Sequence, residues 1–313
     1  MQEITEEWIS EQRAQHYRRT PALRVESVEE ARAFVDAVGF CHFWPIKGIE
    51  TPNLFHAIAG RDRAVPNAHD DPDLSRCWGW KDQSLDKRWW HYAKVLRRRA
   101  TLISLDMLPC FYACSENYGD LEDYLLQYEA GTMTMEARQI YEALLRHGPL
   151  DTVRLRREAR LASDSSKSRF DRGLTELQVG FKVMPVGVAE AGAWNYAFMY
   201  EIVQRHWPGL PAKARAIRRS EARRALVSQY VDNVIAIDRS MVERVFHVMN
   251  WTKSEWEHTF DALLEADLVR EVKVQGGANQ NSANQTLRFA QAQDSANRNP
   301  QGQWLASTRS LRR

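Results

Sequence analysis

The segment GFCHFWPIKG, residues 39–48, concentrates groups that could do chemistry between two glycines. It holds the thiol of Cys41, the imidazole of His42 and three aromatic rings, and Pro45 follows the aromatic run. Histidine titrates near neutral pH, so its imidazole can take up or release a proton under physiological conditions. The same composition is typical of a packed wall, on which a histidine is only hydrogen-bonded. Both interpretations of His42 stay open from these residues alone.

A second segment mixes aromatic with basic side chains. Residues 80–99, WKDQSLDKRWWHYAKVLRRR, contain seven Lys or Arg and two Asp. A surface that follows a nucleic-acid backbone and stacks its bases needs this combination. Arg97, Arg98 and Arg99 are candidate DNA contacts in this interpretation. The alternative is a buried helix face whose flanking arginines reach solvent with their charged ends.

Two further patterns contain possible metal ligands, and neither has a spacing that favours metal binding. Pro72 and the acids around it in HDDPD, residues 69–73, favour a turn and a helix cap. Cys110 and Cys114 have no second pair at zinc spacing. The common nucleotide-binding, hydrolase and metalloprotease motifs do not occur in the sequence. We therefore expect neither a metal nor a cofactor.

The composition of the 313 residues is that of a soluble globular protein with two or three domains. No run of about 18 apolar residues occurs, and the amino terminus is acidic and polar, so we expect no membrane contact and no secretion. The four cysteines are too few and too scattered for a disulfide framework. The expected compartment is cytoplasmic, with nucleoid association if the source is bacterial.

The net charge of +2 conceals an uneven distribution. Residues 275–313 contain five Arg and one Asp, which leaves −2 for the remainder. Residues 212–224, AKARAIRRSEARR, hold six basic side chains against one acid. Basic clusters in a nearly neutral protein favour local contact with a polyanion, although a single charge run more often forms a solvated helix face.

A repeated unit supplies the elements that must position these groups. Residues 135–180 predict three helices, the last of which buries one face with Phe170, Leu174 and Leu177. Two β-prone runs in residues 181–203 then predict a hairpin. Three helices followed by a β-hairpin is the order of a winged helix.

The same order returns about 90 residues further along the chain. Residues 220–268 predict three helices, and the third opens with the capping box Thr252-x-x-Glu255. Both third helices contain Phe-Asp-x-x-Leu and lead into a strand with a lysine. In this copy the expected buried residues are Trp256, Phe260 and Leu264, which turns outward Glu255, His258, Thr259 and Ala262. That face suits phosphate poorly, so we expect this copy to serve architecture or a protein contact.

The third helix of the first copy has a face suited to DNA. In a helix-turn-helix this helix lies in the major groove. Free N–H groups and the dipole at its amino terminus favour phosphate. The expected DNA contacts on its outward face are Ser165, Lys167, Ser168, Arg169 and Arg172.

The expected fold class is α+β, mainly α with small β-hairpin wings, built from tandem winged-helix (helix-turn-helix) domains. Residues 1–130 form a helical or winged-helix region that carries GFCHFWPIKG, with a first helix opened by the capping box Ser27-x-x-Glu30. Residues 131–207 and 208–290 form two winged-helix domains, with a last strand near residue 288. Residues 291–313 form a flexible basic tail.

The order of these elements resembles the winged-helix DNA glycosylases of the AlkZ and YcaQ type, from about residue 25 to about residue 274. In that family a segment G-x-x-Q-x-Q or G-x-x-Q-x-D, followed closely by proline, positions the attacking water at the sugar. Gly39 and Pro45 match this frame, whereas His42 and Trp44 stand at its two polar positions. The resemblance therefore implies that the catalytic pair is replaced.

A second family segment, of the type W-x-H-E/A, falls on CWGWKDQSL. Trp78 and Trp80 match, but no histidine follows, and Asp82 is among the residues at the polar positions. Hydrolysis of an N-glycosidic bond needs a group that holds or deprotonates water and a group that stabilises the cationic sugar. By this resemblance His42 could serve as the first group and Asp82 as the second. Trp44 could stack on a base or wedge into a duplex.

The resemblance implies a protein that binds double-stranded DNA, with alkylated or interstrand-crosslinked bases as the lesions. The replaced pair favours recognition of damage or duplex with weak or no excision. One alternative is an active DNA glycosylase that uses His42 and Asp82. Another is a winged-helix protein-interaction module without a DNA role. The sequence does not indicate an oligomeric state.

Overall fold

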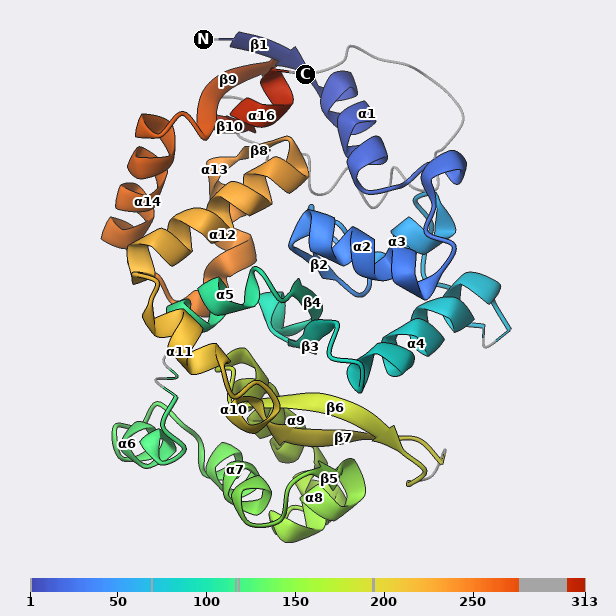
Figure 1. Ribbon diagram of the computed structural model, residues 1–313, viewed down its shortest axis with the longest axis vertical. Coiled ribbons are helices and arrows are strands. Elements are labelled where there is room, and N and C mark those ends of the chain that lie inside the picture. Colours follow the sequence, from blue (N-terminus) through green and yellow to red (C-terminus); the bar gives the residue numbers. More distant parts are fainter. Residues whose placement is uncertain are drawn as a thin grey trace.

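Three units of the same element order follow one another along the chain (Figure 1). Each runs helix, short strand, two helices and antiparallel hairpin, and the second hairpin strand lies between the first and the short strand. This is the winged-helix order, so the expected fold class is confirmed, with one more unit than the two that the sequence repeat indicated. The computed structural model describes residues 2–68, 70–115, 117, 119–192, 195–275 and 303–312.

Unit 1 lies in the amino-terminal region. Its first helix begins at Ser27, whose Oγ accepts the N–H of Glu30 at 3.1 Å. The Glu30 carboxylate accepts the N–H of Glu26 instead of that of Ser27, so the predicted capping box is only half formed. Gly39 ends the helix with φ +72°, and a Cβ there would lie 2.9 Å from Cγ of Met107. The elements of unit 1 are α2 (Val28–Val38), β2 (Phe40–His42), α3 (Leu54–Ala59), α4 (Pro72–Leu85), β3 (Trp90–Lys94) and β4 (Ala100–Ser104).

Unit 2 follows the sequence prediction closely. Phe170, Leu174 and Leu177 are buried on one face of its third helix. Asp151 accepts the N–H groups of Val153 and Arg154 at the start of the second helix. The predicted hairpin is present. The elements of unit 2 are α7 (Met135–His147), β5 (Leu150–Asp151), α8 (Thr152–Glu158), α9 (Lys167–Val179), β6 (Val183–Ala189) and β7 (Ala197–Ile202).

Unit 3 confirms the predicted capping box of Thr252 and corrects part of the predicted helix faces. Thr259 was expected to face outward, but it is buried and its hydroxyl donates to the Glu255 carbonyl at 2.6 Å. The buried face runs from Trp256 to Phe260, four residues later, and then to Leu263, three residues later. Leu263 is therefore buried, and Leu264 is only partly buried. The elements of unit 3 are α12 (Arg219–Val234), β8 (Ala236–Asp238), α13 (Arg239–Phe246), α14 (Lys253–Glu265), β9 (Val269–Gln275) and β10 (Trp304–Ser307).

The prediction of a flexible tail over residues 291–313 is wrong for its last part. Residues 304–307 form β10, the inner strand of the unit 3 sheet, and α16 (Thr308–Leu311) follows. The side chains of Leu305 and Ala306 are buried and pack this strand against the core. The prediction missed them because the tail as a whole is polar in composition. The strand expected near residue 288 lies outside the described residues.

The amino terminus also joins unit 3. Strand β1 (Gln2–Thr5) pairs in parallel with β9, and α1 (Glu6–His16) follows it. In Figure 1 the two chain ends therefore lie side by side at the top of the molecule.

Short helices connect the units: α5 (Leu108–Cys114), α6 (Asp123–Glu129), α10 (Val203–His206) and α11 (Leu210–Arg215). A continuous core runs from Phe40 of unit 1 through Phe111 of α5 to Tyr230 of unit 3. Units 1 and 3 thus lie together, and unit 2 forms the lower end of the molecule (Figure 1).

The acidic segment before α4 acts as a helix cap, as expected. Asp71 accepts the N–H of Leu74 at 2.9 Å, and Pro72 begins the helix. His69 lies outside the described residues. Within the described part of the chain, no three His, Cys, Asp or Glu side chains gather into a metal site. The same residues include no helix long and apolar enough to cross a bilayer.

Candidate nucleic-acid interface

His42 lies inside unit 1 on β2 and is only 1% exposed. Its Nδ1 lies 2.7 Å from Thr51 Oγ1, and its Nε2 lies 3.4 Å from the Leu96 carbonyl oxygen. Burial lowers the pKa of His42 to about 4, and the charges of Arg97 and Arg99 act in the same direction. The imidazole is therefore neutral at neutral pH, packed, and engaged at both nitrogens.

Asp82 lies on α4 and has other partners. Its Oδ1 accepts the hydroxyl proton of Tyr196 at 2.9 Å and lies 2.7 Å from Nζ of Lys81. Among the described residues no hydrogen bond or ion pair joins Asp82 to His42. The structure thus does not assemble the two sequence candidates into one catalytic pair.

Trp44 belongs to an aromatic cluster at the edge of unit 1. Its ring centroid lies 5.9 Å from that of Trp78, which lies 6.5 Å from that of Tyr196. Trp78 is 39% exposed and Tyr196 is 38% exposed, while Trp44 is half-buried. We call Trp44, Trp78 and Tyr196 the aromatic platform. Flat rings partly open to solvent can stack on nucleobases.

Lys81 lies beneath this platform and joins two units. Its side chain is fully buried, and Nζ donates to the Tyr196 hydroxyl at 2.8 Å. Nζ also lies 4.2 Å from the ring centroid of Trp78 and 4.3 Å from that of Phe198, distances of cation–π contacts. Burial lowers the pKa of Lys81 to about 8, and the Asp82 carboxylate opposes that shift. Through these contacts with Tyr196 and Phe198, Lys81 attaches the wing of unit 2 to α4 of unit 1.

The three arginines predicted to contact DNA lie in the turn between β3 and β4, which is the wing of unit 1. Arg98 and Arg99 are exposed, and neither forms an ion pair within the described residues. Arg97 is half-buried and donates to the Arg244 carbonyl at 3.2 Å. Two contacts of Leu96 stabilise this turn. Its N–H donates to Thr101 Oγ1 at 3.1 Å, and its carbonyl faces His42.

The predicted outward face of α9 is present. Arg169 lies 3.5 Å from Glu136, with which it forms an exposed ion pair. Screening by water makes such a pair weak, so it does not prevent a phosphate from competing for the guanidinium. Ser165 lies just before α9, in the 3-10 turn Asp164–Ser166. The five predicted residues are all exposed: Ser165, Lys167, Ser168, Arg169 and Arg172.

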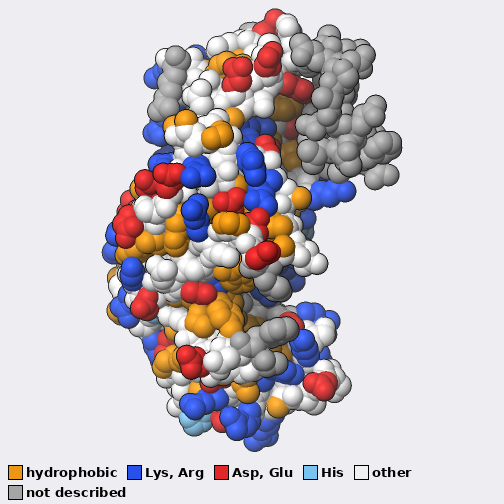
Figure 2. Space-filling model, turned by 90° about the vertical axis from the view of Figure 1, so that its right-hand side faces the viewer, with side chains coloured by type: hydrophobic (Ala, Val, Ile, Leu, Met, Phe, Trp, Pro, Cys, Tyr) orange, Lys and Arg blue, Asp and Glu red, His pale blue; other side chains and the backbone are white. Residues whose placement is uncertain are grey.

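Helix α8 adds basic residues that sequence reasoning did not select. Arg154, Arg157 and Arg160 are exposed at this helix and just after it. Their spacing of three residues along TVRLRREAR was the available signal, since such spacing puts side chains on one helix face. Figure 2 shows Lys and Arg side chains gathered at the lower end of the molecule, where unit 2 lies.

Comparison with known proteins agrees with this architecture. The sequence model of a family described as AlkZ related matches residues 25–247. Among solved structures, a DNA glycosylase AlkZ of Streptomyces sahachiroi is similar with a TM-score of 0.52 and 13% sequence identity, over 93% of this chain and 73% of that chain. At this identity the likeness concerns the fold. A search of curated proteins finds no match.

Proposed function

Because the chain belongs to the AlkZ-related family, we propose that it binds double-stranded DNA and recognises alkylated or crosslinked duplexes with little or no base excision. The observation that carries this proposal is the environment of His42. At the position where the resemblance puts a water-positioning side chain, this protein has a buried, neutral imidazole. The surface around it nevertheless keeps cationic and aromatic groups suited to nucleic acid.

Weak excision follows from the needs of the reaction. A general base must reach the proton it abstracts, directly or through one water. His42 is engaged by Thr51 and the Leu96 carbonyl, and Trp44 offers no acceptor for water. We infer that His42 is a positioning residue that supports the Arg97–Arg99 turn from below.

Duplex binding is proposed from the exposed cations of two elements. Helix α9 is the third helix of unit 2, the helix that enters the major groove in helix-turn-helix proteins. Its Lys167 and Arg172 are exposed, and neither forms an ion pair within the described residues. The arginine turn of unit 1 supplies Arg98 and Arg99. Each contact of this kind with a phosphate releases counterions from DNA and so makes binding sensitive to salt.

Damage recognition is proposed from the aromatic platform. A modified or mispaired base leaves the stack at lower cost than a normal base. The exposed faces of Trp78 and Tyr196 can then stack on it. Since Tyr196 is anchored by Lys81 and Asp82, the platform is already ordered before DNA binds.

One experiment tests binding and excision together. A fluorescein-labelled duplex with a single N7-methylguanine, and its undamaged counterpart, are titrated with protein, and abasic sites are scored in the same samples. We expect the protein to bind both duplexes and to bind the damaged one more tightly. Abasic sites should be no more frequent than in samples without protein. Abundant abasic sites that disappear in His42→Ala would instead support the glycosylase that uses His42 and Asp82. Absence of binding to either duplex would support the protein-interaction module.

A further inference from the structure

The wing of unit 2 is engaged by unit 1. The Tyr196 hydroxyl accepts a hydrogen bond from Lys81 at 2.8 Å and donates one to Asp82 at 2.9 Å. In the same wing, the ring centroid of Phe198 lies 6.1 Å from that of Tyr92, which belongs to β3. This wing therefore forms part of the junction between units 1 and 2.

The wing of unit 1 lies at the end of α9. Near the last turn of that helix, Gln178 Oε1 accepts the Lys94 N–H at 2.9 Å, and α9 contacts both β3 and the turn Leu96–Arg98. Arg172, on the face proposed to enter the major groove, precedes Gln178 by six residues, which is about 9 Å along a helix axis. Because the major groove is about 12 Å wide, an element at this end of α9 lies beside the DNA backbone that separates the major from the minor groove.

The wing of unit 1 ends in a tight turn with an unusual sequence. The Leu96 carbonyl accepts the Arg99 N–H at 3.0 Å, and the two residues between them, Arg97 and Arg98, both have a φ of +54°. A two-residue hairpin turn with two positive φ angles strongly favours Asn-Gly, Asp-Gly or Gly-Gly, because most side chains make this conformation costly. Local stability therefore does not account for the two arginines, and their side chains need another explanation.

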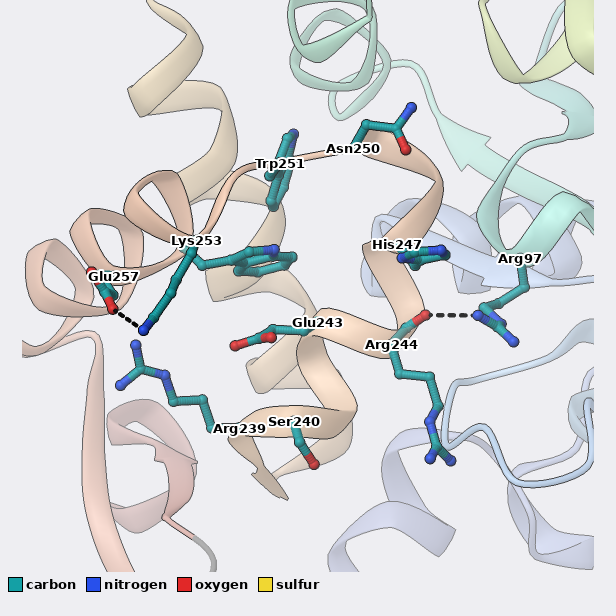
Figure 3. A pocket seen from close by; sticks show the side chains of 11 residues that line it. Arg97, Arg239, Ser240, Glu243, Arg244, His247, Asn250, Trp251, Lys253 and Glu257 are labelled. Carbon is teal, nitrogen blue, oxygen red and sulfur yellow. Dashed lines mark hydrogen bonds and ion pairs between the residues drawn. The ribbon is translucent and has the colours of Figure 1, made fainter.

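The side chain of Arg97 is explained by the junction of units 1 and 3. Its guanidinium donates to the Arg244 carbonyl at 3.2 Å, and both residues line the pocket shown in Figure 3. On the other side of the turn, Leu96 contacts Thr101 and His42. The turn is therefore held in place by units 1 and 3 together.

The side chain of Arg98 has no such role within the protein. It is exposed, and among the described residues it forms no hydrogen bond or ion pair. As the second central residue of the turn, Arg98 lies at the tip of the wing. The minor groove of DNA is about 6 Å wide, and it admits single arginine side chains, which its negative potential attracts where it is narrow.

From this geometry we propose that Arg98 enters the minor groove next to the major groove that α9 occupies, so that unit 1 supplies the wing for the groove helix of unit 2. The proposal rests on the duplex binding proposed above and adds to it a second groove. Some helix-turn-helix proteins combine a helix in the major groove with arginines of a separate arm in the adjacent minor groove. Arg99 remains a phosphate contact.

A preference in base composition follows from this placement. The arginine side chain carries only hydrogen-bond donors. In the minor groove it meets acceptors at A·T pairs, whereas a G·C pair adds the donor of the guanine 2-amino group. The preferred partner is therefore a duplex whose minor groove lacks this amino group. A guanidinium in the groove lies between the phosphates of both strands, so it also displaces counterions.

The test compares two undamaged duplexes of equal length, one of G·C pairs and one in which inosine replaces every guanine. Inosine lacks the 2-amino group, so the two duplexes present the same major-groove edges and differ in the minor groove. Binding is followed by fluorescence anisotropy. We expect the full-length protein to bind the inosine duplex about fivefold more tightly, which is the lower end of the effect of one base-pair change.

Two variants of the turn make the result specific. Arg98→Gly should bind the two duplexes equally, and it should keep the turn, because glycine adopts a positive φ without strain. Arg99→Gln removes a cation of the same turn and should weaken binding of both duplexes by a similar factor, with the preference retained.

Three results would overturn the proposal. The preference could survive in Arg98→Gly, it could disappear to the same extent in Arg99→Gln, or the wild type could bind both duplexes with equal affinity. A protein that binds neither duplex refutes the proposed function itself.

Discussion

Lys81 and Tyr196 belong to different winged helices, and a hydrogen bond of 2.8 Å joins them. The lysine comes from α4 of unit 1, and the tyrosine precedes β7 in the wing of unit 2. The Tyr196 hydroxyl in turn donates a hydrogen bond to Asp82 Oδ1 at 2.9 Å. This three-residue chain sets the position of the aromatic platform.

Removing the hydroxyl of Tyr196 should weaken the junction of the two units. In Tyr196→Phe both hydrogen bonds disappear, and Asp82 is then the one polar partner of the buried Lys81 ammonium among the residues that the structure describes. We expect the free energy of unfolding to fall by about 1–2 kcal/mol. Urea unfolding measures this change. Tyr128→Phe should change stability by less than about 0.5 kcal/mol, because within the described residues the Tyr128 hydroxyl bonds only to the Met135 sulfur, at 3.7 Å. An equal effect of the two variants would refute the role assigned to Tyr196.

The buried Lys81 should make stability depend on alkaline pH. Its pKa is lowered from 10.5 to about 8 on folding. Between these values the unfolded chain binds more protons than the folded chain, so stability rises with pH in this window and is flat below it. The stability of the wild type relative to Lys81→Met should therefore increase between pH 8 and pH 10.5, by up to about 3 kcal/mol at 1.36 kcal/mol per pKa unit. A constant difference across this range, measured by urea unfolding, would contradict the assignment.

His91 should be a destabilising residue. It is fully buried, stacks on Phe181 at 5.2 Å, and has no hydrogen-bond partner at either ring nitrogen among the described residues. Burial lowers its pKa to about 3, and the nearby His206 adds to this shift. As pH falls from 6.5 towards 3, the unfolded chain gains a proton that the folded chain does not, so stability falls. We expect His91→Phe to unfold at higher urea concentration than the wild type at pH 7, with a larger gain at pH 5; a loss of stability at pH 7 would show that the imidazole has a polar role.

The exposed arginines of α9 should contribute to the salt dependence of DNA binding. Arg169→Gln with Arg172→Gln removes two phosphate partners without touching the buried face of the helix. The slope of log K against log salt should become shallower by about 2. Arg24→Gln with Arg32→Gln, which removes two surface arginines of unit 1 that are paired with carboxylates, is the matched control. Equal slopes for the α9 variant and the wild type would place the duplex elsewhere.

Local patterns predicted much of the fold. Helix α9 with its buried Phe170 face and the capping box of Thr252 are confirmed because each depends on residues within a few positions of one another. The sequence left residues 1–130 as a helical or winged-helix region, because α3 of unit 1 is short and a long segment separates it from α4. Strand β10 was missed because its partner β8 lies far away in the sequence.

The site was less accessible to sequence reasoning. Exposure of Arg172 followed from helix periodicity, whereas burial of His42 depends on Thr51 and Leu96, which only the tertiary fold brings to it. The hydrogen bond from Arg97 of unit 1 to the Arg244 carbonyl of unit 3 joins two segments that no local pattern connects. Helix periodicity thus predicted which side chains of α9 face solvent, whereas the burial of His42 depends on tertiary packing.

The salt dependence of duplex binding tests the central claim most directly. Five exposed cations, Lys167, Arg169, Arg172, Arg98 and Arg99, lie on the proposed DNA-binding elements. At about 0.9 per phosphate contact, a plot of log K against log salt for an undamaged duplex should have a slope of about −4 to −5. A slope near zero, or no binding at about 50 mM salt, would contradict the account.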